Sequence, residues 1–353
     1  MREAEPASGR TTIRDVSRLA GVSVATVSAV INGKAAVSEA LTQRVKRAIE
    51  ALDYRPDYLA RSLRMQRSHI LGIVMPQFAS PFYAEVLRGA QDLASQEGYS
   101  ILISNSRGDD DLEWNEVSAL VSRRVDGILL ASTNVQFAYH RFFTRHFPVV
   151  LFDRVPLGFT GTAVVTDNAE ASFKATNHLI GLGHRRIAVI AGTQGISTSE
   201  ERVEGFRRAM YEADLTVRNE YLKRGNFNMK DSWECALELM RLPSPPTAIF
   251  SHNYEMTLGL MRGLAESGVP CPQQVSVLGF DDFVVGADGF SWATMFCPKL
   301  TCVAQSSYEL GRRAAEVLLK KTKRPDGEDH GEEGVIRLRA ELRIRDSTAP
   351  PPS

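Results

Sequence analysis

Apolar residues recur at helical spacing close to the amino terminus. Ile13, Val16 and Leu19 fall on one face of a predicted helix. Thr12 caps the start of this helix, and Asp15 stands three positions further on, as in a capping box. The pattern therefore predicts a short amphipathic helix at the beginning of the folded chain.

Two further helices are predicted directly after it. Gly21 tolerates the positive φ of a tight turn, Ser23 can cap a second helix over 24–32, and a third helix of about fifteen residues begins near 37. The residues expected to face inward are Val27, Val30, Ile31, Leu41, Val45, Ala48, Ile49 and Leu52. Three such helices can enclose one small core. This is the pattern of a helix-turn-helix unit, whose second helix enters the major groove of DNA.

The outward residues at the start of the second helix are short. Val24, Ala25, Ser28 and Ala29 would lie nearest the base edges if this helix entered a groove. A small three-helix domain that binds protein fits the same spacing, and the helices alone leave this alternative open.

The segment from Tyr54 to Arg64 alternates basic residues with leucines. Pro56 can start a short helix that carries Leu59 and Leu63. A basic helix with an exposed leucine suits a minor-groove wedge, in which the apolar side chain separates two base pairs while arginines neutralise phosphates. Taken alone, the segment also fits a solvated charged linker.

Charge is distributed unevenly along the 353 residues, although the formal net charge is +0. Residues 1–67 hold 12 of the 42 Lys and Arg but only 7 of the 42 Asp and Glu, a net charge of +5. The remainder carries 30 basic and 35 acidic residues. Only the amino-terminal part therefore has the charge that favours contact with phosphate backbones.

From His69 the pattern changes to short apolar runs separated by amphipathic stretches. The runs predict buried parallel strands over 70–76, 100–106, 125–132, 147–153, 185–192, 247–253 and 274–282. The intervening stretches predict helices over 83–97, 112–123, 169–182, 200–213 and 256–267. This alternation predicts doubly wound parallel sheets with helices on both faces, arranged as two similar lobes.

In open α/β sheets, ligands bind beyond the carboxyl ends of the strands. This rule selects Gln77, Phe78, Asp153, Asn253 and Asp281 as candidate ligand contacts. Each also has a structural interpretation, because a carboxylate can cap a turn and an aromatic ring can belong to the core.

The motifs and their order resemble those of the LacI/GalR family of bacterial regulators. The resemblance rests on residues 11–64, TTIRDVSRLAGVSVATVSAVINGKAAVSEALTQRVKRAIEALDYRPDYLARSLR, and on GLGHRRIAVIAG, ESGVPCPQQVSVLGFDD and LTCVAQ in the body. It spans nearly the whole chain. It implies an all-α helix-turn-helix headpiece and an α/β periplasmic-binding-protein-like core of two lobes around a cleft.

The resemblance implies roles for particular residues. Val24, Ala25 and Ala29 occupy base-reading positions, and Leu63 the position of the intercalating leucine. The predicted DNA-binding set is Thr12, Ser23, Val24, Ala25, Thr26, Ser28, Ala29, Asn32, Arg55, Leu63 and Arg64. The predicted effector-binding set is Phe78, Phe82, Asp153, Arg202, Phe227, Asn253 and Asp281.

This chain departs from the family pattern in two places. Ala29 stands where the family usually has a larger polar residue, so a bidentate base contact is absent there and DNA bending should contribute more to specificity. Tyr254 stands where an aspartate usually follows the asparagine. That change leaves the identity of the effector open.

The predicted organisation follows from these patterns and the resemblance. We expect a disordered amino terminus (1–11), a headpiece (12–54), a hinge helix and linker (55–68), a core (69–346) and a disordered tail (347–353). Within the core, the predicted lobe 1 comprises 69–166 and 300–323, and the predicted lobe 2 comprises 167–292 and 335–346. The charged loop 323–334 is also predicted to be disordered.

The predicted function is a sequence-specific transcription repressor that binds a palindromic double-stranded DNA operator as a homodimer. A small-molecule effector, a sugar or sugar derivative, would control its affinity for the operator. Activation instead of repression, and a tetramer instead of a dimer, stay open. An enzyme on the same scaffold is disfavoured, because no phosphate-binding loop, nucleophile elbow or catalytic histidine pair stands at a strand end.

Composition agrees with an intracellular regulator. No apolar run approaches a membrane span, and the amino terminus lacks a secretory signal, so we predict a cytoplasmic protein. The four cysteines show no metal-binding spacing, and His178 and His184 lack an acidic partner in a metal motif. We predict no metal and no cofactor. A transport-type binding protein would suit the body alone, but not the headpiece.

Overall fold

The computed structural model describes residues 11–31, 37–54, 67–133, 147–285, 289–323 and 334–352. Its chain divides into two compact units between Ser68 and His69. Four of the predicted DNA contacts, Asn32, Arg55, Leu63 and Arg64, lie outside the described residues.

The first unit contains three helices in its described part. They are α1 (Ile13–Ala20), α2 (Val24–Ile31) and α3 (Glu39–Ala51). Val16, Val27 and Val45 are fully buried at the centre of their shared core. Leu19, predicted to face inward, is instead 56% exposed, and Ala20 takes the buried position on α1.

Gly21 allows α1 and α3 to approach each other at the turn. Its φ is +61°, a left-handed conformation that glycine adopts without strain. A Cβ atom here would lie 2.9 Å from Arg44 Nη2. That nitrogen donates to the carbonyl of Ala20 at 2.7 Å, so Arg44 of α3 satisfies the carboxyl end of α1.

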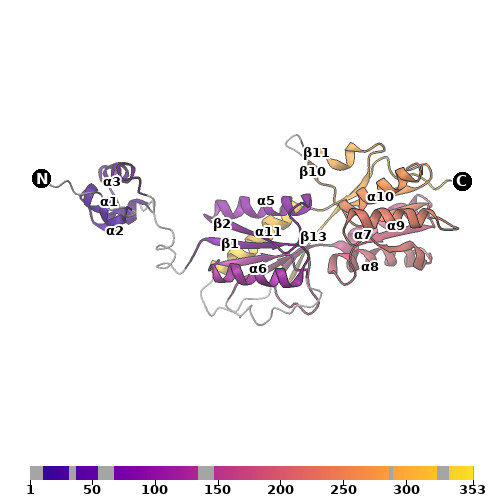
Figure 1. The fold of residues 1–353 in the computed structure, drawn as a ribbon, viewed down its shortest axis with the longest axis horizontal. Coiled ribbons are helices and arrows are strands. Elements are labelled where there is room, and N and C mark those ends of the chain that lie inside the picture. Colours follow the sequence, from indigo (N-terminus) through magenta and orange to yellow (C-terminus); the bar gives the residue numbers. More distant parts are fainter. Residues whose placement is uncertain are drawn as a thin grey trace. The chain divides into compact units, whose positions relative to one another are not determined.

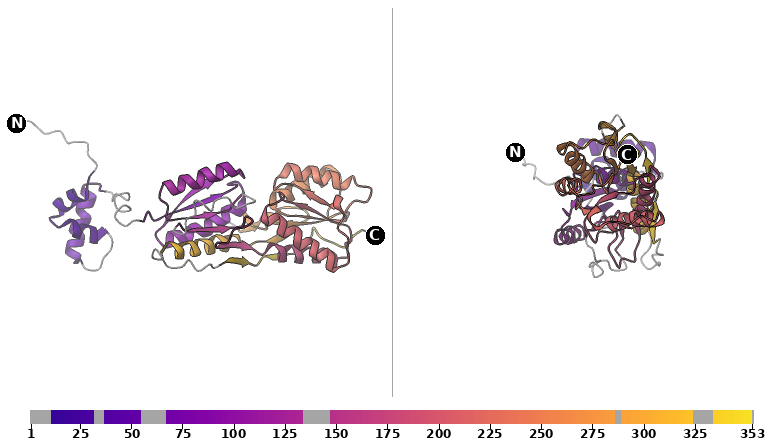
Figure 2. Two further views of the ribbon diagram at one scale, coloured as in Figure 1. Left: turned by 90° about the horizontal axis from the view of Figure 1, so that it is seen from below. Right: turned by 90° about the vertical axis from the view of Figure 1, so that its right-hand side faces the viewer.

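The second unit consists of two lobes, each built on a six-stranded sheet (Figure 1). The lobe 1 sheet has the order β13-β5-β4-β3-β1-β2 with every pair parallel, and the lobe 2 sheet has the order β14-β12-β9-β8-β6-β7. Only the β12 and β14 pair of the lobe 2 sheet is antiparallel. Figure 2 shows helices on both faces of each sheet.

Lobe 1 uses both faces of its sheet. Alternate strand residues point to opposite sides, so Ile73 packs against α5 and α11 while Val74 packs against α6. The elements of lobe 1 are β1 (Ile70–Met75), α5 (Pro81–Gln96), β2 (Ser100–Asn105), α6 (Asp110–Ser122), β3 (Gly127–Leu130), β4 (Val149–Phe152), β5 (Ala163–Thr166), α11 (Ser307–Lys323) and β13 (Val335–Leu338).

Lobe 2 repeats this arrangement, with α7 and α8 on one face of its sheet and α9 and α10 on the other. Its elements are α7 (Asn168–Gly181), β6 (Ile187–Ala191), α8 (Ser197–Glu212), β7 (Leu222–Arg224), α9 (Met229–Met240), β8 (Ala248–Ser251), α10 (Tyr254–Glu266), β9 (Ser276–Phe280), β12 (Thr301–Ala304) and β14 (Glu341–Arg343). The 3-10 helices η2 (Asn219–Tyr221) and η3 (Trp292–Met295), and the hairpin of β10 (Val284–Val285) and β11 (Phe290–Ser291), complete it.

Helices α5 and α11 pack with their backbones in contact, because glycines stand where they cross. A Cβ atom on Gly89 would lie 2.0 Å from the carbonyl oxygen of Tyr308, and one on Gly311 would lie 1.8 Å from that of Val86. Any other residue at either position would force the two helices apart.

The structure corrects the predicted lobe boundaries. Strand β12, assigned from sequence to lobe 1, pairs with β9 in lobe 2, and β13, assigned to lobe 2, pairs with β5 in lobe 1. Three segments therefore cross between the lobes: 166–168, 304–307 and 338–341. Sequence patterns show where strands are but not which sheet an edge strand joins.

The prediction of a disordered tail is wrong for the described residues 347–352. Ser347 is fully buried; its hydroxyl donates to the carbonyl of Val277 at 2.6 Å and accepts from Thr301 N at 2.8 Å. His184 Nε2 lies 2.8 Å from the carbonyl oxygen of Ala349. Polar contacts hold this segment, so it carries no hydrophobic pattern that sequence analysis could detect.

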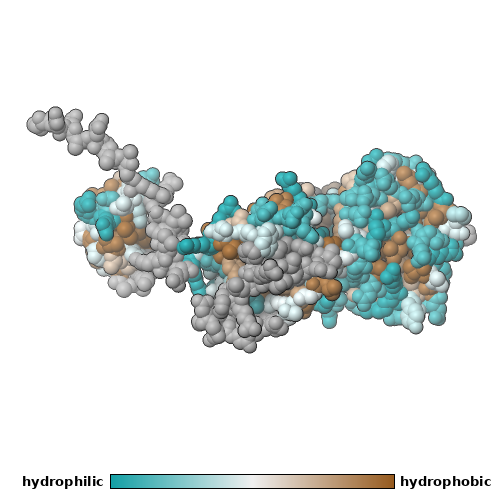
Figure 3. Space-filling model, turned by 60° about the horizontal axis from the view of Figure 1, so that its bottom comes forward, coloured by the Kyte–Doolittle hydropathy of each residue, from teal (hydrophilic) through white to brown (hydrophobic). Residues whose placement is uncertain are grey.

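The visible outer surface of lobe 2 is mostly polar. In Figure 3, hydrophilic residues predominate over the visible face of lobe 2, with smaller hydrophobic patches between them. Among the described helices, none combines the length and the apolar character that a membrane span requires.

Candidate functional site

The headpiece presents the start of α2 to solvent. Val24 is 40% exposed and Ala25 is exposed, whereas Thr26, Ser28 and Ala29 are half-buried. Val27, on the opposite face, is fully buried and orients the helix. The presented surface is small and largely apolar.

Capping interactions fix the amino-terminal ends of α1 and α2. Ser23 Oγ accepts from the backbone of Thr26 at 3.1 Å, as its sequence position predicted. The backbone and hydroxyl of Thr12 donate to Asp15 Oδ2 at 3.0 and 2.6 Å. These bonds lower the pKa of Asp15, so its carboxylate stays charged at the amino end of α1, where a negative charge is favoured.

In the second unit, strand ends of the two lobes meet directly. Gln77 Nε2 of lobe 1 donates to Glu255 Oε1 of lobe 2 at 2.6 Å. The Arg154 guanidinium lies 5.3 Å from the centroid of the Phe227 ring. We call the residues at this edge the inter-lobe cluster: Gln77, Tyr83, Asp153, Arg154, Arg202, Phe227, Asn253, Glu255, Asp281 and Gln305.

Lobe 1 contributes a buried carboxylate to the cluster. Asp153 follows β4, has a φ of 62° and accepts a hydrogen bond from Tyr83 Oη at 2.6 Å. Burial, and this carboxylate beside it, raise the pKa of Tyr83 well above its usual range, so its hydroxyl remains a donor. Arg154 Nε lies 3.6 Å from Asp153 Oδ2 and makes no hydrogen bond to a described residue.

Lobe 2 contributes a buried arginine. Arg202 of α8 is 3% exposed, and its guanidinium stacks 3.7 Å from the centroid of Phe280. Its Nε donates to Asn168 Oδ1 at 2.8 Å, and its Nη1 donates to the carbonyl of His252. Burial lowers its pKa, and the carboxylates of Asp281 and Asp153 act in the opposite direction.

Asp281 is the matching carboxylate in lobe 2. It follows β9, has a φ of 73° and is 8% exposed. Its Oδ2 accepts from the backbone of Tyr254 at 3.3 Å, and its Oδ1 accepts from Gln305 Nε2 at 2.5 Å. Burial raises its pKa, while Arg202 and these hydrogen bonds oppose the rise.

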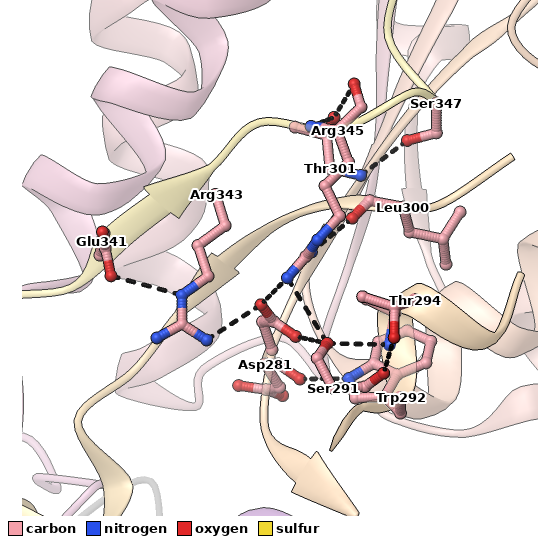
Figure 4. A network of polar contacts seen from close by, with 12 residues as sticks. Asp281, Ser291, Trp292, Thr294, Leu300, Thr301, Glu341, Arg343, Arg345 and Ser347 are labelled. Carbon is pink, nitrogen blue, oxygen red and sulfur yellow. Dashed lines mark hydrogen bonds and ion pairs between the residues drawn. The ribbon is translucent and has the colours of Figure 1, made fainter. Parts of the chain in front are cut away.

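The next residue, Asp282, holds a second buried network. Its carboxylate accepts hydrogen bonds from Arg343, Arg345 and Ser291, whose side chains converge in Figure 4. The Arg343 and Arg345 nitrogens lie 3.2 and 2.5 Å from its Oδ2. Sequence analysis missed this network because its members are far apart in the chain.

The expected contact Asn253 and the residue after it, Tyr254, both have structural partners. Asn253 caps α10, where its Oδ1 accepts from Met256 N at 2.8 Å. Tyr254 packs against Phe283 and Trp292, with ring centroids 4.8 and 4.7 Å away. The departure from the family pattern at Tyr254 therefore extends an aromatic cluster in lobe 2, and the adjacent Glu255 makes the polar contact with lobe 1.

The predicted aromatic contacts separate into different environments. Phe78 is 52% exposed after β1, whereas Phe82 is 7% exposed and packs in the lobe 1 core. Phe227 has a φ of 58°, and its ring covers Gly192, where a Cβ atom would lie 2.1 Å from it. Trp292 is buried and donates from Nε1 to the carbonyl of Asp281 at 2.7 Å (Figure 4).

The described residues include no group of three or more His, Cys, Asp or Glu side chains placed to hold a metal ion. His184, one of the two histidines considered from the sequence, is instead buried between Thr247 and Ser276, with its ring nitrogens 2.9 and 3.1 Å from their hydroxyls.

A helix-turn-helix unit joined to a two-lobed α/β core defines the class of ligand-responsive DNA-binding regulators. Residues 12–57 match the bacterial regulatory proteins of the lacI family, and residues 68–343 match the periplasmic binding proteins and sugar binding domain of the LacI family. The chain belongs to the LacI family.

Relatives agree over nearly the full length. The chain is 33% identical over 338 residues to the HTH-type transcriptional repressor PurR of Vibrio vulnificus (strain CMCP6), covering 95% of this chain and 98% of the relative. It is 34% identical over 316 residues to the ribose operon repressor of Escherichia coli (strain K12), covering 89% and 94%. A solved complex of the transcriptional regulator CelR with cellobiose superposes with a TM-score of 0.70 at 31% identity, over 96% of this chain and 100% of that one.

These matches confirm the fold class, the family and the broad function. The protein is a DNA-binding regulator of a non-enzymatic family of repressors that respond to small-molecule effectors and typically act as dimers.

Proposed function

We propose that the effector is a neutral carbohydrate bound at the inter-lobe cluster, and that it controls the affinity of a homodimeric repressor for a palindromic operator. The carrying observation is the pairing of buried charges at the centre of the cluster. Asp153 and Asp281 are both buried carboxylates, and Arg154 and Arg202 supply two guanidiniums beside them. The third carboxylate, that of Glu255, already accepts a hydrogen bond from Gln77. Two carboxylates matched by two guanidiniums favour a ligand with hydroxyls over one with a net charge.

The available polar atoms support the same ligand class. Arg154 Nε and Gln305 Oε1 are buried and make no hydrogen bond to a described residue, so the first can donate to a ligand and the second can accept from one. A sugar hydroxyl can both donate and accept. The Phe227 ring at the same edge provides an apolar face of the kind against which a sugar ring can pack.

For the effector site we retain Phe78, Asp153, Arg202, Phe227, Asn253 and Asp281. Phe82 is better explained by packing, because it lies in the lobe 1 core. Asn253 would contribute through its amide nitrogen, since its Oδ1 already caps α10. The residue that sequence analysis missed is Gln305, which the structure joins to Asp281.

On the DNA side we propose that Val24 and Ala25 contact base edges while Ser28 and Ala29 lie beside them. Leu63 would act as the wedge in the minor groove. The other predicted contacts would hold the protein against the DNA phosphate backbone: Thr12, Ser23, Thr26, Asn32, Arg55 and Arg64. The exposed apolar start of α2 supports direct contact with thymine methyl groups. A protein that acts on chromosomal DNA would work in the cytoplasm.

The test is a binding panel on the full-length protein. Thermal shift and calorimetry would compare D-ribose, D-glucose and cellobiose with ribose 5-phosphate, gluconate and adenine. A binder at 100 times its Kd stabilises the folded state by about 2.7 kcal/mol. We expect a neutral sugar to bind and the charged compounds to bind at least tenfold more weakly.

Two variants locate the binding. Asp281→Ala should abolish the shift, whereas Arg207→Ala, an exposed arginine on the same helix as Arg202, should leave it unchanged. Tighter binding of the phosphate or the acid, or unchanged sugar binding in Asp281→Ala, would contradict the proposal.

A further inference from the structure

All three crossing segments are tied to Arg202 or Asp281, two charged residues of the inter-lobe cluster, or to Glu201, the direct neighbour of Arg202. Asn168 ends the first crossing, Gln305 lies in the second, and Arg337 stands in β13 directly before the third. Asn168 and Gln305 bond to Arg202 and Asp281, and Arg337 pairs with Glu201, the neighbour of Arg202.

The first link is a buried amide. Asn168 is 1% exposed; its Oδ1 accepts from Arg202 Nε at 2.8 Å and its Nδ2 donates to Glu201 Oε2 at 3.2 Å. Glu201 Oε1 in turn accepts from both terminal nitrogens of Arg337, at 3.1 and 3.2 Å. One side chain therefore connects Arg202 with the first crossing directly, and with the third through an ion pair.

The second link is Gln305. Its Nε2 donates to Asp281 Oδ1, and its Oε1 is buried without a hydrogen bond to a described residue. If a ligand takes the carboxylate to which this amide donates, the amide loses its one strong hydrogen bond. It can then rotate, because a new position can give its unpaired oxygen a hydrogen-bond donor. A rotation of the Gln305 amide would therefore exchange the positions of its two polar atoms when the surroundings of Asp281 change.

We propose that Asn168 and Gln305 are positioning residues that transmit the occupancy of Arg202 and Asp281 to the crossing segments, and so set the angle between the lobes and the affinity for DNA. The proposal rests on the proposed function for the location of the effector. A ligand hydroxyl that bonds to Asp281 or Arg202 changes the hydrogen bonds available to these amides. Coupling then requires no contact between the ligand and the crossing segments.

A double-mutant cycle in the ligand-free, full-length protein tests the second link. The probe is a DNA duplex selected from a random library by the wild-type protein. Asp281→Ala and Gln305→Met each break the same hydrogen bond. We expect both to change the Kd for the duplex in the same direction, by about threefold or more, and the double variant to match the larger single effect.

The matched control is Arg339→Ala in the third crossing, an exposed residue whose side chain makes no ion pair or hydrogen bond recorded among the described residues. In the double variant with Asp281→Ala, the fold change in Kd for the duplex should equal the product of the two single fold changes. Independent, multiplying effects of Asp281→Ala and Gln305→Met would overturn the proposal. Because no sugar is present, a wrong effector class cannot produce that result.

Hydrogen exchange tests the first link without relying on DNA. Asn168→Ala should raise amide exchange by about tenfold in peptides that cover 166–168 and 338–341, and leave β6 protected. Asn177→Ala, on the same helix, should change neither crossing. Exchange that rises evenly through lobe 2, β6 included, would show a merely structural role for Asn168 and refute the link.

Discussion

At the edge where the lobes meet, lobe 1 presents the buried carboxylate Asp153 and lobe 2 presents two, Asp281 and Asp282. Asp153 is held by Tyr83 and lies beside Arg154, its own neighbour in the chain. The lobe 2 pair bonds to several segments, among them Gln305 in the second crossing, Arg343 of β14 and Arg345 directly after β14.

This difference indicates separate roles for the lobes. The lobe 2 carboxylates fasten β9, β14 and the second crossing to one another, so a change at either one is felt in several segments. The partners described for the lobe 1 carboxylate, Tyr83 of α5 and the adjacent Arg154, both belong to lobe 1, so it can move with its lobe. We therefore expect lobe 2 to be the more rigid side of the site and lobe 1 the side that rotates.

The largest expected effect is at Asp282, whose side chain is fully buried. Asp282→Ala leaves Arg345 without its carboxylate, a loss of about 3 kcal/mol in the free energy of unfolding. Urea denaturation followed by circular dichroism measures it. As a control, Glu234→Ala removes only an exposed pair 3.9 Å from Lys230 and should cost under about 0.5 kcal/mol. Equal losses would remove the contrast between buried and surface charge.

The next effect concerns pH. Burial, and the charges of Arg202 and Arg224, lower the pKa of His252 well below its usual range, and burial also lowers that of His184. At these two histidines the unfolded chain therefore binds more protons than the folded chain as the pH falls below about 6.5. Stability is fully present above that pH and is lost as the pH falls through the lowered pKa values.

We expect the free energy of unfolding to fall between pH 7.5 and 5.5, with His252 contributing up to about 1.4 kcal/mol. His252→Gln should flatten this dependence, as measured by urea titrations at each pH. The effect should appear in lobe 2 peptides by hydrogen exchange, because His252 and His184 are both in that lobe. A pH dependence unchanged in His252→Gln would show that another group titrates.

The sequence predicted the parts of this comparison that depend on local pattern. Strand ends placed Asp153 and Asp281 at the lobe edges, because parallel strands present their carboxyl ends on one side of a sheet. Buried runs such as 187–191 were found because every residue in them is apolar. The resemblance added Arg202, which no local pattern distinguishes from other helical arginines.

The rest depended on contacts between distant segments. The Asp282 network joins residues more than 60 positions apart, and Gln305 is an ordinary glutamine until β12 is known to lie beside β9. The tail was missed for the same reason, since its serine and threonine find partners only in the folded lobe. Hydrophobic periodicity carries no information about polar partners of this kind.

The smallest expected effect lies at one of the hydrogen bonds between the lobes, the one from Gln77 to Glu255. Gln77→Ala should lower the free energy of unfolding by only about 1 kcal/mol, because a half-buried neutral donor is lost and the rest of each lobe is untouched.

The sharper variant is Gln77→Glu, which sets two carboxyl groups against each other. Burial raises the pKa of Glu255, so a shared proton can restore the contact as the pH falls. Amide exchange after β1 and at the start of α10 should therefore be faster than in the wild type at pH 7.5, and return toward it at pH 5. If Gln77→Glu exchanged like the wild type at both pH values, the lobes would not be held by this contact, and lobe 1 would lack the mobile role that distinguishes it from lobe 2.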